Sequence, residues 1–144
     1  MPIKTFRGLI ADGATDTIVL HTNDGSTGYR IKKLQVFPYQ PGKESTESTI
    51  QIWSVNPNLT STTAVEVDFS NQELLAAALF HDSSSEGNLN PMYVVFDNMV
   101  FNQDIFVTHT DTNSSEPVNY YMELEQIKLD LNENTVATLK DIRN

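Results

Sequence analysis

VNYYMELEQIKL, residues 118–129, is the stretch that decides the fold, because it holds the longest strand pattern in the chain. Apolar residues alternate from Val118 to Leu124, and the apolar series then continues at Ile127 and Leu129 on the other parity. Side chains alternate strictly between the two faces of a strand, so only an extra residue can change the face. The pattern therefore predicts a long strand with a β-bulge near Glu125-Gln126.

Residues 130–144 follow this strand with the clearest helix pattern in the chain. Asp130-Leu-Asn-Glu133 has the spacing of a capping box, in which both side chains accept hydrogen bonds from amides at the helix start. Lys140 and Arg143 lie in the last turn, where the helix dipole favours cations. So short a helix is marginal in isolation, and we expect it to dock on another surface. The apolar residues expected at that contact are Leu131, Val136, Leu139 and Ile142.

A second, shorter helix is predicted after Ser70. Ser70-Asn-Gln-Glu73 repeats the capping-box spacing, and Leu74–Phe80 consists mostly of strong helix formers. The segment is apolar nearly all round, so we expect it either to plug an end of the sheets or to lie between subunits. The contact residues expected there are Leu74, Leu75, Leu79 and Phe80.

The rest of the chain has the pattern of short strands separated by turns. Asp24-Gly25 can supply the positive φ angles of a tight hairpin. A change of parity predicts a second bulge at Lys32-Lys33. Residues 64–69 show the cleanest alternation of all. The predicted strands span residues 3–11, 17–22, 29–39, 49–55, 64–69, 92–97 and 100–110.

Many short strands with only two short helices predict a mainly-β fold, an antiparallel β-sandwich or jelly-roll-like domain. Strands and helices do not alternate along the chain, which argues against a parallel α/β sheet. We expect residues 1–144 to form one such domain, with the C-terminal helix at 130–144.

The composition excludes several functional classes. Nine Lys and Arg against 19 Asp and Glu give a formal charge of −10, the wrong sign for gathering phosphates. We therefore expect neither nucleic acid nor an anionic membrane as a partner. The absence of cysteine excludes disulfides and thiolate metal sites. The opening residues lack the apolar core of a signal peptide, and no apolar run approaches the length of a membrane span.

Candidate metal ligands occur in two places. His109 and Asp111 share a strand face, where a divalent ion would still need a third partner. Asp12, Asp16 and Asp24 lie in turns where calcium could bind, although Asp in turns mostly hydrogen-bonds its own backbone. We expect ordinary strand-end and turn residues at these positions, and no cofactor.

Candidate catalytic residues are equally sparse. His81-Asp82-Ser83 has the residue types of a hydrolase, but adjacent side chains on an extended chain point apart. Glu123 and Glu125 share a strand face, as paired carboxylates do in glycosidases, yet such rows on half-exposed strands mostly face water. The chain also lacks a glycine-rich phosphate loop. We therefore expect a protein that is not an enzyme.

Aromatic side chains give the alternative function, because sugar-binding sandwiches stack pyranose rings on exposed aromatic residues. The candidates are Trp53, Tyr93, Tyr120 and Tyr121. Tyr and Trp also suit core and rim positions of a pleated sheet, so most of the four should be structural. Two or more aromatic rings on one exposed face would favour sugar binding.

Two blocks at the ends of the chain carry a resemblance. Residues 118–129 run into TVATLKDIRN at 135–144, and FRGLIA at 6–11 is followed by Asp12-Gly13. Together they resemble small virion proteins of tailed phages, especially marine ones. The resemblance implies a capsid decoration or cement protein, or another accessory piece of a head or tail, built as an oligomeric β-sandwich. It carries over no functional residue.

The first hypothesis is thus a non-enzymatic virion structural protein that stabilises a particle through subunit contacts and assembles in the host cytoplasm. Its expected partners are the major capsid protein or other virion subunits, and further copies of itself, with a trimer favoured. The alternative is a carbohydrate- or receptor-binding β-sandwich module, such as a tail or fibre component.

Overall fold

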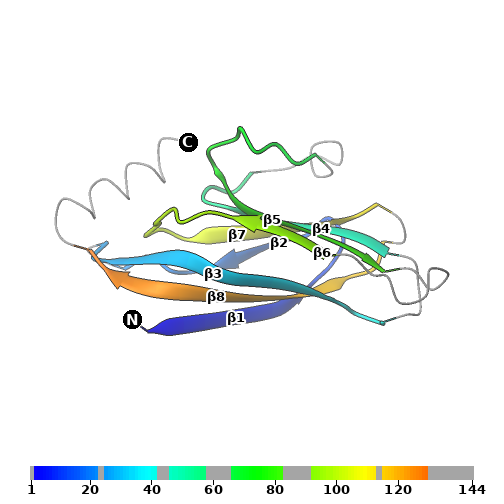
Figure 1. Cartoon of the computed structure of the whole chain (residues 1–144), viewed down its shortest axis with the longest axis horizontal. Helices are drawn as coiled ribbons and strands as arrows, with labels where there is room; N and C mark the ends of the chain where they lie inside the picture. Colours follow the sequence, from blue (N-terminus) through cyan, green and yellow to red (C-terminus); the bar gives the residue numbers. More distant parts are fainter. Residues whose placement is uncertain are drawn as a thin grey trace.

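The protein folds into two antiparallel β-sheets that lie one above the other (Figure 1). The structure is a computed structural model that describes residues 2–22, 25–41, 46–57, 66–82, 92–112 and 115–129. The mainly-β prediction with two antiparallel sheets is confirmed. The predicted C-terminal helix at 130–144, with Leu131, Val136, Leu139 and Ile142, lies outside the described residues.

The smaller sheet is built around the long strand predicted at residues 118–129. β8 (Val118–Lys128) is its central strand, flanked by β1 (Ile3–Ile10) and β3 (Thr27–Pro38). The even-numbered positions of β8 from Val118 to Leu124 are buried and face the other sheet, as their alternation predicts.

The larger sheet has five strands in the order β2-β7-β4-β5-β6. Their bounds are β2 (Thr15–Ile18), β7 (Ile105–Asp111), β4 (Thr46–Trp53), β5 (Leu74–Asp82) and β6 (Met92–Phe96). Ile50, Ile52 and Val107 are fully buried and pack in one core cluster with Met122 and Leu124 of the smaller sheet. Burial of a large aliphatic side chain is worth about 1.5–3 kcal/mol, so this core is the main source of stability.

The pairing of the strands is nested: β1 pairs with β8, β2 with β7, and β4 with β5. The predicted hairpin at Asp24-Gly25 is therefore wrong. Gly25 does have the positive φ that a tight turn needs, +67°. However, β2 and β3 belong to different sheets, so the chain crosses between sheets here instead of turning back on itself.

One of the two predicted bulges is present. Along β3, Ile31 pairs with Leu124 and Lys33 pairs with Glu123, so Lys32 is the extra residue. The bulge predicted at Glu125-Gln126 is wrong, because the β3–β8 ladder runs through these residues without a shift.

The predicted helix at Leu74–Phe80 is wrong, since these residues form most of β5. Paired on both sides by β4 and β6, the strand buries a continuous apolar run. A short apolar run of this kind cannot be distinguished from a buried helix by periodicity alone. Leu75 is buried, and Leu74, Leu79 and Phe80 are half-buried.

The predicted strand at 64–69 is also wrong where the structure describes it. Residues 66–69 are not in a strand, and the side chains of Val67 and Phe69 are 42% and 67% exposed. Asp68 forms a turn by accepting hydrogen bonds from the backbone and hydroxyl of Ser70.

No helix in the described ranges has the length and apolar character needed to cross a membrane.

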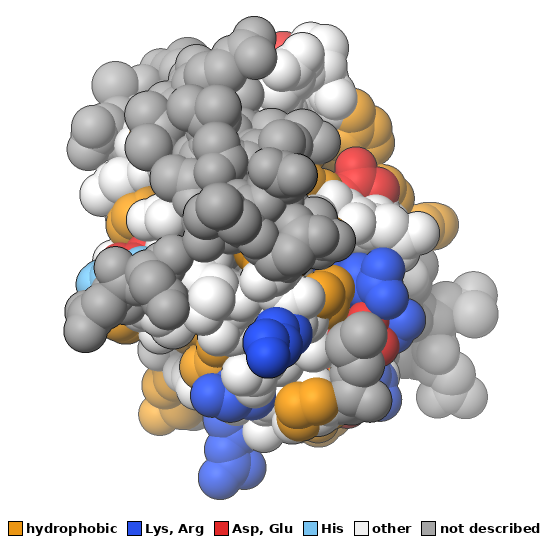
Figure 2. All heavy atoms as spheres, turned by 90° about the vertical axis from the view of Figure 1, so that its left-hand side faces the viewer, with side chains coloured by type: hydrophobic (Ala, Val, Ile, Leu, Met, Phe, Trp, Pro, Cys, Tyr) orange, Lys and Arg blue, Asp and Glu red, His pale blue; other side chains and the backbone are white. Residues whose placement is uncertain are grey.

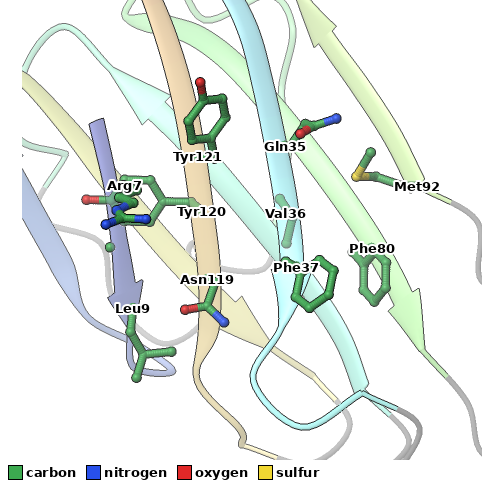
Figure 3. Close-up of a pocket in the computed structure, with 11 residues that line it drawn as sticks. Arg7, Leu9, Gln35, Val36, Phe37, Phe80, Met92, Asn119, Tyr120 and Tyr121 are labelled. Atoms are coloured by element: carbon green, nitrogen blue, oxygen red, sulfur yellow. The ribbon is translucent and has the colours of Figure 1, made fainter. Parts of the chain in front are cut away.

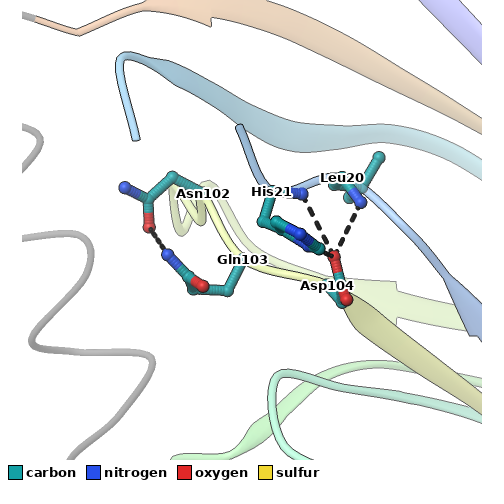
Figure 4. A network of polar contacts seen from close by, with 5 residues as sticks. All are labelled: Leu20, His21, Asn102, Gln103 and Asp104. Atoms are coloured by element: carbon teal, nitrogen blue, oxygen red, sulfur yellow. Dashed lines mark hydrogen bonds and ion pairs between the residues drawn. The ribbon is translucent and has the colours of Figure 1, made fainter. Parts of the chain in front are cut away.

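Residues 101–104, which precede β7, connect the two layers (Figure 4). Phe101 exchanges backbone hydrogen bonds of 2.8 and 2.9 Å with Tyr29 of β3. The Asp104 carboxylate accepts hydrogen bonds from the Leu20 amide (2.9 Å), and from the His21 amide (3.1 Å) and ring (2.7 Å). Burial acts to raise the pKa of Asp104, but these hydrogen bonds outweigh it and lower the pKa.

Charge is divided unequally between the two sheets. All six Lys and Arg in the described residues lie on β1, β3 and β8: Lys4, Arg7, Arg30, Lys32, Lys33 and Lys128. The strands of the five-stranded sheet contain neither Lys nor Arg. In Figure 2 the Lys and Arg side chains accordingly gather in the lower half, where the three-stranded sheet lies. An acidic protein thus has one cationic sheet.

Candidate functional site

An open groove of about 950 Å³ lies on the outer surface of the three-stranded sheet. Six outward-facing side chains line it, two from each strand, and Figure 3 shows them side by side. They are Arg7 and Leu9 of β1, Asn119 and Tyr121 of β8, and Gln35 and Phe37 of β3. Phe80 of β5 and Met92 of β6 extend the lining beyond the edge of β3.

Strand pairing arranges these side chains in two rows. Arg7, Tyr121 and Gln35 are direct cross-strand neighbours, and so are Leu9, Asn119 and Phe37. Adjacent strands lie about 4.8 Å apart, so each row spans about 10 Å across the sheet. The groove surface is therefore held by backbone hydrogen bonds and is organised before any ligand arrives.

Three polar groups in the groove lack a partner within the described part of the chain. The guanidinium of Arg7 and the side-chain amides of Gln35 and Asn119 make no hydrogen bond or ion pair there. The groove therefore presents one cation and two groups that both donate and accept hydrogen bonds.

Neighbouring acids are, in contrast, already engaged. Glu123 accepts a hydrogen bond of 2.8 Å from the Tyr121 hydroxyl, which raises the pKa of Tyr121. Arg30 donates to Glu125 at 2.6 Å and thereby lowers the pKa of that carboxyl. These contacts leave Arg7 as the unpaired charge in the groove.

Beneath the groove, the inner face is tightly packed against Gly8. A Cβ atom on Gly8 would lie 3.0 Å from the hydroxyl of Tyr120, so glycine makes room for this ring. The Tyr120 hydroxyl also donates a hydrogen bond of 3.2 Å to Asp16 of β2. Burial, with a further contribution from Asp16, raises the pKa of Tyr120 to about 12. Tyr120 thus supports the groove from below.

The groove reaches Phe80 and Met92 because β6 pairs with β5 and continues the larger sheet. Among the described strands, β3 pairs only with β8, and its other edge carries the single bridge from Tyr29 to Phe101. Phe80 and Met92 line the groove beyond this edge.

The structure separates the four aromatic candidates. Trp53 is 5% exposed and donates a hydrogen bond of 3.0 Å to Thr108, and Tyr120 is 6% exposed. Tyr121 lines the groove, whereas Tyr93 is exposed on β6. Sequence reasoning missed Phe37, which is 63% exposed, because it was counted as part of an ordinary strand. Its outward parity next to the Lys32 bulge was the available signal.

The metal and catalytic candidates do not converge. Among the described residues, no three His, Asp or Glu side chains are placed to hold a metal ion. Asp111 and Asp12 are used in backbone contacts: Asp111 accepts from the amide of Glu116 at 3.0 Å, and Asp12 accepts from the amide of Asp111 at 2.8 Å. Ser83 and Asp24 lie outside the described residues.

Of the four predicted contact residues that the structure describes, Phe80 is the one that borders the groove. Leu74 and Leu75 instead line a small hollow of about 160 Å³ beside β6, together with Val95 and Phe69.

Comparison with known proteins does not extend this description. No family model matches the chain, and no curated protein matches it.

Proposed function

We propose that this protein is a non-enzymatic structural subunit, of the kind that decorates a phage capsid, and that it joins copies of itself through the edge strand β6. The observation that carries the proposal is that, among the described strands, β6 forms an edge that carries none of the usual protecting features. Its sequence, MYVVF, contains no charge and no proline, and Tyr93 and Val95 are 63% and 51% exposed. Unpaired backbone groups on such an edge are a ready template for another strand.

The other three edges of the two sheets differ from β6. β2 is short and includes Asp16, and β1 includes Lys4 and Arg7. β3 has the bulge at Lys32 followed by Lys33. Charges, bulges and short length are the usual means of preventing strand addition, so of the four described edges β6 is the one that favours it.

A second copy of the chain is a suitable partner for β6. If two β6 strands pair antiparallel about Val94, Tyr93 lies opposite Val95 of the other copy and no like charges meet. The hollow beside β6, lined by Phe69, Leu75 and Val95, offers a neighbouring side chain an apolar site. Such a contact gives a dimer. A trimer would need β6 to pair with one of the three protected edges and a rotation that closes the ring.

The nested pairing β1–β8, β2–β7 and β4–β5 is that of a hairpin rolled into two layers. We therefore infer a jelly-roll-like β-sandwich in which β6 belongs to the larger sheet instead of the smaller one. Jelly rolls occur in viral capsid proteins and in lectins, which supports the virion function by analogy only.

Light scattering behind a sizing column tests the self-association. The wild-type chain is expected above the monomer mass, and Val95→Lys is expected at the monomer mass because it puts a charge on the exposed edge. Val19→Lys is the matched control, since Val19 is 67% exposed and lies away from β6. A monomeric wild type, or dissociation by Val19→Lys as well, contradicts the proposal.

Mass spectrometry of purified phage particles tests the virion role separately. The chain is expected in stoichiometric amount relative to the capsid protein. Its absence from particles produced by a host that expresses it contradicts that role, whatever its oligomeric state.

A further inference from the structure

We propose that the groove on the three-stranded sheet is a binding site for an acidic saccharide, a glycan unit that carries a carboxylate. The inference is independent of the β6 contact, because the groove lies mainly on the three-stranded sheet and Met92 is the one β6 residue that lines it. It follows from the kinds of side chain that the three strands bring together there.

The polar side chains of the groove suit a sugar that carries a carboxylate. Arg7 offers a planar fork of donors that matches a carboxylate, while Gln35 and Asn119 offer amides that donate and accept at once. Sugar hydroxyls likewise donate and accept. Since none of the three side chains has a partner in the described chain, a ligand would not have to displace existing contacts.

Aromatic and aliphatic side chains alternate with the polar ones in the groove. Tyr121 lies between Arg7 and Gln35, and Asn119 lies between Leu9 and Phe37. A pyranose ring has apolar C–H faces and a polar rim, so it needs both kinds of contact within a short distance. A row of about 10 Å is about the length of a disaccharide.

The charge of the three-stranded sheet favours an anionic ligand. β1, β3 and β8 hold six Lys and Arg but only two acids, Glu123 and Glu125. Arg30 is paired with Glu125, which leaves five Lys and Arg against Glu123, whose hydrogen-bond donor is the uncharged hydroxyl of Tyr121. Lys33 lies with its ammonium 5.9 Å from the centre of the Tyr121 ring, so a second cation borders the groove. A neutral sugar would leave these charges unused, and an anionic one is attracted by them.

An acidic peptide is the competing ligand. It would satisfy Arg7, but a peptide that adds to the edge of β3 would run two strands away from Arg7, which lies on β1. The amides and exposed rings therefore favour a saccharide.

Titration followed by calorimetry and by NMR tests the proposal with matched probes. The acidic probe is oligogalacturonate, and its control is the same oligomer with methyl-esterified carboxyl groups. Sialyllactose and lactose form a second matched pair, and a polyglutamate peptide represents the acidic peptide. At least one acidic sugar is expected to bind about tenfold or more tighter than its neutral partner, since charge-assisted hydrogen bonds are the strong ones.

Variants locate the binding. Arg7→Ala is expected to weaken binding of the acidic sugar about tenfold or more, and Phe37→Ala to weaken both members of a pair. Lys4→Ala is the matched control, because Lys4 is exposed on the same strand and does not line the groove. All three altered side chains are exposed, so the fold should be retained, which circular dichroism checks.

Three results overturn the proposal. The first is that neither acidic sugar binds at millimolar concentration. The second is that Arg7→Ala and Lys4→Ala lose the same amount of affinity for the acidic sugar. The third is that polyglutamate binds as tightly as the acidic sugars or more tightly. The last result would identify the groove as a peptide site. None of them bears on self-association through β6, which light scattering measures independently.

Discussion

His109 is a polar, titratable residue in an apolar, buried environment. Its side chain faces the core from β7 and is 1% exposed, and within the described chain neither ring nitrogen has a hydrogen-bond partner. Burial lowers the pKa of His109, although the nearby carbonyl of Ala11 and the carboxylates of Asp12 and Asp111 oppose this effect. The ring is therefore neutral in the folded protein at neutral pH.

This burial makes stability depend on pH. Because the pKa of His109 is lower in the folded than in the unfolded chain, the unfolded chain takes up the proton first as the pH falls below about 6.5. The free energy of unfolding should then fall by up to about 1.4 kcal/mol per pH unit until the lowered pKa is reached. Urea unfolding between about pH 5 and pH 7.5 measures this slope.

His109→Leu is the variant that isolates the effect. This substitution removes the titrating imidazole and its two unsatisfied nitrogen atoms. The free energy of unfolding of the variant should therefore change less with pH than that of the wild type over the same range. An unchanged slope would assign the pH dependence to other groups.

At the scale of residues, sequence patterns located side chains well only where parity was regular. The buried positions of β8 followed from alternation, but the groove residue Phe37 did not, because exposed aromatic side chains and buried ones share the same strand patterns. Likewise, the burial of Trp53 depends on its contact with Thr108, which is 55 residues away in the chain.

Among the elements, β3 gives an unusual expectation for a deletion. Lys32 is the extra residue between Ile31 and Lys33, so removing it would leave both flanking halves in their present register with β8. We expect deletion of Lys32 to change the free energy of unfolding by less than about 1 kcal/mol.

Deletion of Gln35, three residues further on, is the matched comparison. It would shift one half of β3 by a residue and turn its inward side chains, such as Val36, to the other face. We expect this variant to lose cooperative unfolding in urea. If the Lys32 deletion were equally damaging, the bulge would have a structural role beyond accommodating one residue.

β5 shows why the predicted elements were only partly right. Leu74–Phe80 has helix-forming residues and a capping-box sequence before it, and local preference alone favours a helix. Two flanking strands nevertheless bury the segment as the neighbour of both β4 and β6, and burial outweighs the small differences in propensity. Residues 66–69 show the reverse case, in which regular alternation does not produce a strand.

For the whole molecule, the unequal charge of the two sheets should govern binding to charged surfaces. Despite a net charge of −10, the chain should be retained on a cation exchanger at low salt, because the three-stranded sheet has a local excess of positive charge. Salt of about 0.1–0.2 M should release it, since exposed charges are screened within about 10 Å.

Two double variants with equal net charge test this expectation. Arg7→Gln with Lys33→Gln should abolish retention, whereas Thr15→Glu with Thr17→Glu on β2 should leave it in place. Equal elution of the two would show that net charge, not its distribution, controls binding.

The nested pairing of the strands also has a consequence for synthesis of the protein. β1 is made first, but its partner β8 begins only at Val118. While the chain is still on the ribosome, β1 and β3 must therefore wait unpaired until the residues from Val118 onward have been made. Long-range strand pairing folds slowly and leaves apolar strands open to other chains, so chaperones that hold nascent chains should have a long time in which to act.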